Sequence, residues 1–256
     1  MNNTNKPTTM NPTSATHQRR CFSLAICLLL GASIAEVQAD SIFIPDFSFE
    51  DVDYADGTGA FDLVPGWTRT GGGGNASGVF DSTDTFFPGT SGAGNLPAPG
   101  HGQQTSFLHV ADFGSVDWFS AASLGIIQPN TTYTLTVAIG VSLDFPVPVN
   151  AGQGSIFIRR SGFLQAAQTT FSPHTLTPGT FTDFTTTFTT GESGGFIGEP
   201  FSVGVGYGGP ISSGIKADNV RLDATVVPEP TAAAFLLSSS LLLLRRRSGL
   251  ASERNG

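Results

Sequence analysis

Histidine, serine and carboxylate side chains are the first candidates for chemistry in this sequence. Beyond residue 39 the histidines are His101, His109 and His174, and no two of them have the H-x-x-x-H spacing typical of a zinc site. A Gly-x-Ser-x-Gly sequence occurs at 191–195. A nucleophilic serine in this motif lies at a strand-to-helix turn, and we expect almost no helix in this domain, so we assign it no catalytic role. Two carboxylates facing each other across a cleft could hydrolyse a glycosidic bond, but a sequence does not define their separation. We therefore expect a protein that is not an enzyme, with a secreted glycan-active enzyme as the minor alternative.

Two aromatic residues are candidates for binding a sugar. Sugar rings stack on exposed aromatic faces that are flanked by hydrogen-bonding groups. Trp118 follows a glycine-containing turn and is the first candidate for an exposed ring, and Tyr207 is the second. The competing interpretation is that Trp118 closes one end of the core, because tryptophan is usually highly buried. Trp67, at the start of an expected strand, is assigned to the core.

Residues 40–226 are strongly acidic. They contain five basic and seventeen acidic side chains, a net charge of −12. Such a charge repels nucleic acid and anionic lipid, so we expect no nucleic-acid partner, and it supplies many oxygen ligands for calcium. The acidic run Asp51–Asp56 only loosely matches a calcium loop, and solvated loop carboxylates are the better interpretation. Both cysteines, Cys21 and Cys27, precede this region.

The elements that must position these residues are β-strands. Apolar and polar residues alternate with a period of two over 132–143, and similar patterns occur in 184–188, 201–207 and 220–226. Shorter candidates are 41–44, 106–110 and 155–160. Turns rich in Gly, Pro, Asn and Ser separate these segments, without helical crossovers, so we predict an all-β fold, an antiparallel jelly-roll β-sandwich. The glycine- and proline-rich stretch 71–102 is predicted to be a long loop, either functional or mobile.

The N-terminal segment predicts export. Arg19 and Arg20 precede an apolar stretch, 21–34, and small residues lead to Ala39. This order is typical of a secretory signal peptide, so we assign residues 1–39 to a signal and 40–226 to the exported domain.

The C-terminal segment, 227–256, contains a short apolar run, 232–244, followed by Arg245, Arg246 and Arg247. As a helix this run reaches about 20 Å, against about 30 Å of hydrocarbon in a bilayer. The motif Val227, Pro228, Glu229, Pro230 precedes it. Motif, apolar run and arginines together resemble the PEP-CTERM sorting signal of Gram-negative bacteria.

That resemblance implies processing by an exosortase, a transient anchor in the inner membrane, and release to the cell surface or into an exopolysaccharide matrix. An uncleaved tail anchor is the alternative. We accordingly expect a non-enzymatic protein of the cell envelope, outer surface or extracellular matrix, associated with exopolysaccharide. A lectin-like carbohydrate-binding module is the alternative function.

The ends of the domain resemble a second family. The segments 44–50, 64–67 and 216–222 are similar to the first and last strands of galactose-binding-like jelly rolls, the fold of many carbohydrate-binding modules. The resemblance implies that Glu50 and Asp218 hold a structural calcium ion together with backbone carbonyls. Strand alternation would place Asp218 on the same face as Val220 and Leu222, where a carboxylate needs a cation or hydrogen bonds. The alternative is that Asp218 caps a turn or accepts hydrogen bonds from backbone amides.

Overall fold

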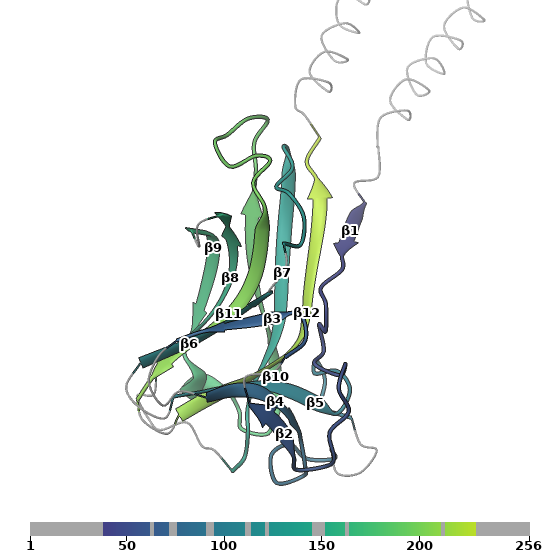
Figure 1. The fold of residues 1–256 in the computed structure, drawn as a ribbon, viewed down its shortest axis with the longest axis vertical. Helices are drawn as coiled ribbons and strands as arrows, with labels where there is room; N and C mark the ends of the chain where they lie inside the picture. The colour runs from purple at the N-terminus through teal and green to yellow at the C-terminus, as the bar shows by residue number, and fades with distance from the viewer. Residues whose placement is uncertain are drawn as a thin grey trace, which may run out of the picture. The chain divides into compact units, whose positions relative to one another are not determined.

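The computed structural model describes residues 38–61, 64–71, 76–90, 95–110, 114–120, 123–144, 152–161, 164–210 and 213–228. They belong to one compact unit, Gln38–Pro228 (Figure 1). The predicted signal peptide, apart from its last two residues, and the sorting segment beyond Pro228 lie outside the described residues, so both remain predictions. No helix among the described residues has the length and apolarity needed to cross a membrane.

Two antiparallel sheets form a β-sandwich, which confirms the predicted fold. The larger sheet has the strand order β10-β7-β12-β5-β4-β2, and β1 pairs with β12. Its strands are β1 Ala39–Ile42, β2 Gly59–Phe61, β4 Ala76–Asp81, β5 Gln104–Val110, β7 Thr131–Val141, β10 Thr180–Thr189 and β12 Ser213–Val226. The smaller sheet has the order β3-β6-β11-β8-β9, formed by β3 Trp67–Thr70, β6 Gly114–Ser120, β8 Gln153–Arg160, β9 Leu164–Phe171 and β11 Phe201–Gly209. A short 3₁₀ helix, η2 Pro173–Thr175, precedes β10.

The core lies between the two sheets and follows the period-two pattern. In β7 the odd-numbered residues from Tyr133 to Val141 are buried, whereas Leu143, expected to continue the strand, is 44% exposed. Trp67 belongs to the same core, as expected from its position. Alternation thus identifies the inward residues because the side chains of a strand point to opposite faces in turn.

One irregularity changes the face on which Asp218 lies. The register of β12 against β7 shifts between Asp218 and Arg221, and Asn219 has a left-handed backbone (φ 45°). Ala217 and Val220 both belong to the core although they are three residues apart, as a β-bulge requires. Asp218 therefore lies on the outer face, and the expectation that it shares a face with Val220 and Leu222 is wrong.

The stretch predicted as a long loop, 71–102, contains a strand. Residues Ala76–Asp81 form β4, which pairs with both β2 and β5. The segment that follows folds over the outer face of the larger sheet, where Phe87 and Leu96 pack with Ala138 and Phe181 in a second apolar cluster. The Phe87 and Phe181 rings stack with centroids 4.6 Å apart. This covering segment forms one wall of the pocket described below.

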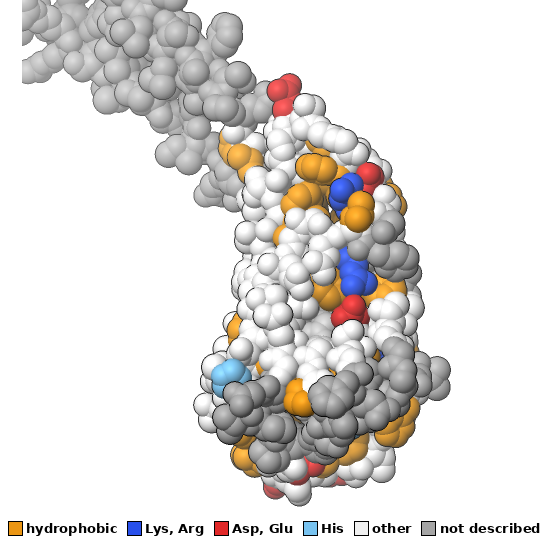
Figure 2. All heavy atoms as spheres, turned by 90° about the vertical axis from the view of Figure 1, so that its left-hand side faces the viewer, with side chains coloured by type: hydrophobic (Ala, Val, Ile, Leu, Met, Phe, Trp, Pro, Cys, Tyr) orange, Lys and Arg blue, Asp and Glu red, His pale blue; other side chains and the backbone are white. Residues whose placement is uncertain are grey.

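Charged groups are sparse on one side of the domain (Figure 2). Figure 2 shows one side of the molecule, on which most described atoms are backbone or uncharged polar groups, and the basic groups in view lie beside acidic ones. The described chain has two such partly buried pairs, Arg159 with Asp117 at 2.9 Å and Arg160 with Glu199 at 3.4 Å. The domain as a whole carries a net charge of −12 over residues 40–226, and the absence of a nucleic-acid partner stays a prediction.

Candidate active-site pocket

A row of residues crosses the outer face of the larger sheet, and three of its members, Lys216, Phe107 and Phe61, line a pocket. Its members are in register from strand to strand, and two of the six are glycines that lie between bulky residues. In order from β10 to β2 they are Phe181, Gly140, Lys216, Phe107, Gly78 and Phe61. Their strand neighbours, such as Leu108 and Ile215, point into the core. The row therefore faces away from the smaller sheet.

Glycine is required in this row because the rings lie over it. A Cβ atom at Gly78 would overlap the carbonyl oxygen of Ala60 and lie 2.9 Å from the Phe107 ring. At Gly140 a Cβ would lie 2.8 Å from the Phe181 ring. The missing side chains thus allow the aromatic rings to lie close to the sheet and leave open space above it.

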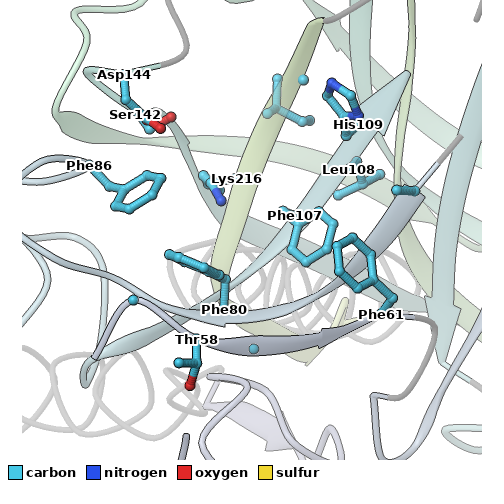
Figure 3. Close-up of a pocket in the computed structure, with 15 residues that line it drawn as sticks. Thr58, Phe61, Phe80, Phe86, Phe107, Leu108, His109, Ser142, Asp144 and Lys216 are labelled. Atoms are coloured by element: carbon cyan, nitrogen blue, oxygen red, sulfur yellow. The ribbon is translucent and has the colours of Figure 1, made fainter. Parts of the chain in front are cut away.

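The pocket above this row has a volume of about 510 Å³ (Figure 3). Its walls come from β2, β4, β5, β12 and the segments after β4 and β7. The lining is mostly apolar, with four phenylalanines: Phe61, Phe80, Phe86 and Phe107. Phe61 is 67% exposed and meets the Phe107 ring edge-on at 5.4 Å. A concave apolar site of this size, with few polar groups, is typical of small-molecule binding.

Lys216 is the basic residue of this lining. Its side chain projects between three rings, with Nζ 5.0 Å from the centroid of Phe80, 5.6 Å from Phe86 and 5.2 Å from Phe107 (Figure 3). Burial lowers the pKa of Lys216 to about 8, and the negative charge of Asp144 partly opposes this effect. No carboxylate of the described residues forms an ion pair with it. The ring faces are therefore the main compensation for its positive charge.

Two further titratable groups lie in the pocket. His109 is on β5, two residues from Phe107 and on the same face, so it is a diagonal neighbour of Lys216. Burial lowers the pKa of His109, and the positive charge of Lys216 lowers it further, so its imidazole is neutral at pH 7. Asp144 is exposed at the rim beside Ser142 (Figure 3). The pocket thus offers a cation or amine, a neutral imidazole and a rim carboxylate.

The predicted calcium residues lie beside the covering segment. Glu50 Oε1 accepts hydrogen bonds from the backbone amides of Gln103 and Gln104, at 2.8 and 2.7 Å. Asp218 is fully buried, and its carboxylate accepts from the amides of His101 and Asn219, each at 2.6 Å. Both carboxylates therefore accept hydrogen bonds from backbone amides, which is the alternative to calcium binding that the sequence analysis gave for Asp218.

Two buried aspartates that the sequence did not single out lie near these residues. The pKa of Asp46 is raised to about 6, chiefly by burial, and that of Asp81 is also raised to about 6. Burial raises the pKa of Asp218 well above its ordinary value, and the charges of Glu50 and Asp46 add to the effect. The oxygen Asp46 Oδ2 has no hydrogen-bond partner. Among the described residues, no three His, Cys, Asp or Glu side chains are arranged as a metal site, so backbone carbonyls would have to complete any calcium site.

The residues expected to bind sugar are in the core. Trp118 is 2% exposed, and its indole N–H points to the carbonyl oxygen of Phe107 at 3.4 Å. Tyr207 is 1% exposed. The expectation that Trp118 is an exposed ring is wrong, and the competing interpretation holds, since both residues belong to the core between the sheets.

The pocket residues were missed for an identifiable reason. Lys216 entered the sequence analysis as one of five positive charges and as the first residue of the segment 216–222, without a role of its own. Phe61, Phe80 and Phe107 are not distinguishable by type from the many core phenylalanines. One signal was present in the sequence. Lys216 alternates with Ile215 and Ala217 in a strand pattern, and it is the only lysine after Lys6.

The chain is similar to solved cyclase structures. The apo form of a cyclase from Fischerella sp. superposes with a TM-score of 0.57 and 24% identity over 75% of this chain and 98% of that one. A cyclase from Fischerella sp. TAU, in complex with 4-(1H-indol-3-yl)butan-2-one, gives a TM-score of 0.55 and 21% identity over 74% and 100%. These likenesses concern the fold.

A carbohydrate-binding module solved with beta-1,4-galactotriose is a more distant neighbour. Its TM-score is 0.45 and its identity 8%, over 72% of this chain and 97% of that one, so it says nothing about a ligand here. No curated protein matches the sequence.

A family model identifies the chain. The model described as HpiC1-like, HpiC1 cyclase, matches residues 40–223, which is most of the sequence and nearly all of the sandwich. The prediction that the protein is not an enzyme is therefore wrong, because the matching family is one of cyclases. Hydrolytic and zinc motifs were the only signs of an enzyme considered in the sequence, and membership of a cyclase family depends on neither. The chain belongs to the HpiC1-like cyclase family.

Proposed function

We propose that this protein is a small-molecule cyclase that binds an aromatic, largely apolar substrate in the pocket and activates it with the Lys216 side chain. The observation that carries the proposal is the position of Lys216 Nζ, 5.0–5.6 Å from three phenylalanine rings on the floor and wall of the pocket. A cation at such a place is costly to maintain for structure alone, since an apolar side chain would fill the same space.

The chemistry follows from the protonation states of the pocket groups. Below pH 8 Lys216 is mainly protonated, so Nζ can donate a proton to a substrate atom. The faces of Phe80, Phe86 and Phe107 then stabilise positive charge that develops on the substrate, each by about 0.5–2 kcal/mol. Neutral His109 can accept the proton that ring closure releases, which balances the reaction as an isomerisation.

The comparisons support the choice of an aromatic substrate. The Fischerella sp. TAU cyclase was solved with an indole ketone, and a pocket of about 510 Å³ lined by four phenylalanines suits a molecule of that size and character. An aromatic ligand would stack on Phe61 and Phe107 at the open side of the pocket.

Ligand binding tests this proposal directly. Titration calorimetry of the full chain with 4-(1H-indol-3-yl)butan-2-one should show saturable binding to one site. Phe107→Ala should weaken binding about tenfold or more, because it removes one stacking ring and part of the apolar lining. Arg221→Met, which changes a partly exposed cation on the same strand, is the matched control and should leave the affinity unchanged. Absence of saturable binding, or equal binding by the Phe107 variant, would refute the assignment of the pocket.

We further propose that the cyclase acts outside the cytoplasm. The support is the order of the terminal segments, a signal-like stretch at 1–39 and the PEP-CTERM-like segment 227–256. Exosortase processing would release the domain to the cell surface or to an exopolysaccharide matrix. Mass spectrometry of the native product is the test: an N-terminus at Asp40 and a C-terminus near Pro230 are expected, whereas an intact arginine tail on surface protein would contradict exosortase processing.

A structural calcium ion near Glu50 and Asp218 remains our proposal. Its support is electrostatic: Asp46, Glu50 and Asp218 influence one another's charge, and two of them are almost fully buried. A cation bound there with backbone carbonyls would offset this repulsion and tie the first part of the domain to β12. Thermal melting of calcium-loaded protein with and without chelator tests the proposal, since a ligand bound only by the native state raises its stability.

A further inference from the structure

Lys216 has the surroundings of a nucleophilic amine. It projects from β12 into an apolar pocket, its ammonium is not ion-paired to any described carboxylate, and space for a ligand lies above it. We propose that Lys216 Nζ forms a covalent imine with the carbonyl carbon of an aromatic aldehyde or ketone bound in this pocket. The inference rests on the proposed function, because it uses the same pocket. It adds the class of substrate, and for a carbonyl substrate it gives Lys216 a covalent role in place of the proton donation described above.

The aromatic rings place the amine beside a site for the carbonyl group. Phe80, Phe86 and Phe107 surround Nζ, and the exposed ring of Phe61 lies beside Phe107 (Figure 3). An aromatic substrate that stacks on Phe107 and Phe61 would bring a short side chain to Nζ. The enclosure also limits access of bulk water, which would otherwise hydrolyse the imine.

The amine is available in its reactive form. Imine formation needs neutral nitrogen, and about half of Lys216 is neutral at pH 8, a fraction about a hundredfold larger than that of an ordinary lysine. Among the described residues, the titratable groups that act on Lys216 are His109 on β5 and Asp144 after β7. Phe80 on β4 and Phe86 after it face Lys216 with uncharged rings. The pocket therefore lowers the proton affinity of Nζ and still leaves Nζ accessible to a ligand.

The step balances without any oxidant or reductant. The Nζ lone pair attacks the carbonyl carbon while the C=O π electrons move to oxygen, which takes up a proton. Loss of the nitrogen proton and of the hydroxyl group as water then forms the C=N bond. His109 is a diagonal neighbour and is neutral, so it can carry the proton between nitrogen and oxygen. The protonated imine then loses an α proton to His109 and becomes an enamine. The enamine α carbon forms the ring bond to an electrophilic carbon of the same substrate, and the electrophilic group takes up the proton from His109. This step restores the C=N bond, so hydrolysis with one water releases the ring-closed carbonyl product and the free amine.

The sequence makes this inference easy to test. The chain contains two lysines, Lys6 and Lys216. Full-length protein is incubated at pH 8 with 4-(1H-indol-3-yl)butan-2-one and sodium cyanoborohydride, which reduces an imine to a stable secondary amine. Peptide mass spectrometry should then find a mass increase equal to the ketone less one oxygen atom on Lys216. We expect labelling of Lys216 to exceed that of Lys6 by about tenfold or more, given its larger neutral fraction.

Controls distinguish binding of the ketone in the pocket from formation of the imine at Lys216. The corresponding alcohol, 4-(1H-indol-3-yl)butan-2-ol, cannot form an imine and should compete for the pocket and reduce labelling. Lys216→Arg, checked for folding by its thermal melt, should bind the ketone in calorimetry but acquire no label at residue 216. Saturable binding of the ketone with no adduct, or with equal labelling of Lys6 and Lys216, would overturn the imine and leave the cyclase pocket standing. Absence of saturable binding would overturn the proposed function, and the imine with it.

Discussion

Replacing Lys216 with methionine should stabilise the folded protein at neutral pH, although it removes the group on which the proposed activity depends. Methionine keeps the length and apolar stem of lysine and can contact the same rings, Phe80, Phe86 and Phe107. What it removes is the cost of holding a charge in an apolar pocket.

The lowered pKa of Lys216 sets the size of the effect. Its pKa falls from 10.5 in the unfolded chain to about 8 in the fold. Well below pH 8 this difference costs the native state about 3 kcal/mol by linkage. The lost cation–π contacts offset part of the gain, so we expect Lys216→Met to raise the free energy of unfolding by about 1–3 kcal/mol at pH 6.5.

The pH dependence gives the prediction its sign. Between pH 8 and 10.5 the unfolded chain holds the lysine proton more tightly than the native state does, so wild-type stability contains a contribution that rises with pH across this window. The variant lacks this contribution. Its advantage should therefore be full at pH 6.5 and vanish near pH 10.5.

Urea denaturation at both pH values measures the effect, with the variant and the wild type compared at each pH. Arg221→Met is the matched control, because Arg221 lies on the same strand but is partly exposed and paired with Asp183. An exposed pair contributes about 0–1 kcal/mol, so this control should show no gain at either pH. A Lys216→Met variant that is less stable than wild type at pH 6.5, or whose advantage does not change with pH, would refute the claim that the pocket destabilises the charge.

Three further predictions concern other parts of the fold. In chelator the melting temperature should fall as pH rises from about 4 to 7, because Asp46 and Asp81, with pKa values of about 6, and Asp218 bind protons more tightly in the native state. Calcium should restore the lost melting temperature, and a melting temperature that rises with pH in chelator would contradict this electrostatic account. Gly78→Ala should lower the free energy of unfolding in urea by about 1–3 kcal/mol and weaken ketone binding, because the added methyl group displaces the Phe107 ring. Gly195→Ala, at an exposed glycine, is the neutral control. Trp118→Ala should cost about 3–5 kcal/mol, while Trp118→Phe should stay folded with unchanged retention on a polysaccharide array; selective loss of retention would restore the sugar-binding hypothesis.

The fold was predictable because its pattern is local. The alternation from Thr132 to Val141 follows directly from the geometry of a strand with one face in a core, and β7 has that geometry. The strand β4, in contrast, was not predicted, because it follows four consecutive glycines and itself contains Gly78. Gly78 lies in it for the space it leaves rather than for flexibility, and only the pairing with β2 and β5 shows this.

The site was less predictable because it depends on register between distant segments. Lys216 and Phe107 are opposite each other only because β12 pairs with β5 in one particular alignment. A single sequence contains no direct signal of that alignment. The position of Asp218 shows the same limit, since strict alternation assigns it to the core face and one left-handed residue, Asn219, reverses the assignment.

The bulge at Asn219 also constrains how this protein can change. Before the bulge the odd-numbered residues Ile215 and Ala217 face the core, and after it the even-numbered residues Val220 and Leu222 do. The extra residue of the bulge makes this change of pattern possible. Deleting that residue would turn Val220 and Leu222 out of the core, or else rotate Lys216 away from the pocket. We therefore expect the length of this strand to tolerate no single-residue deletion between 216 and 222, even where its exposed side chains vary freely.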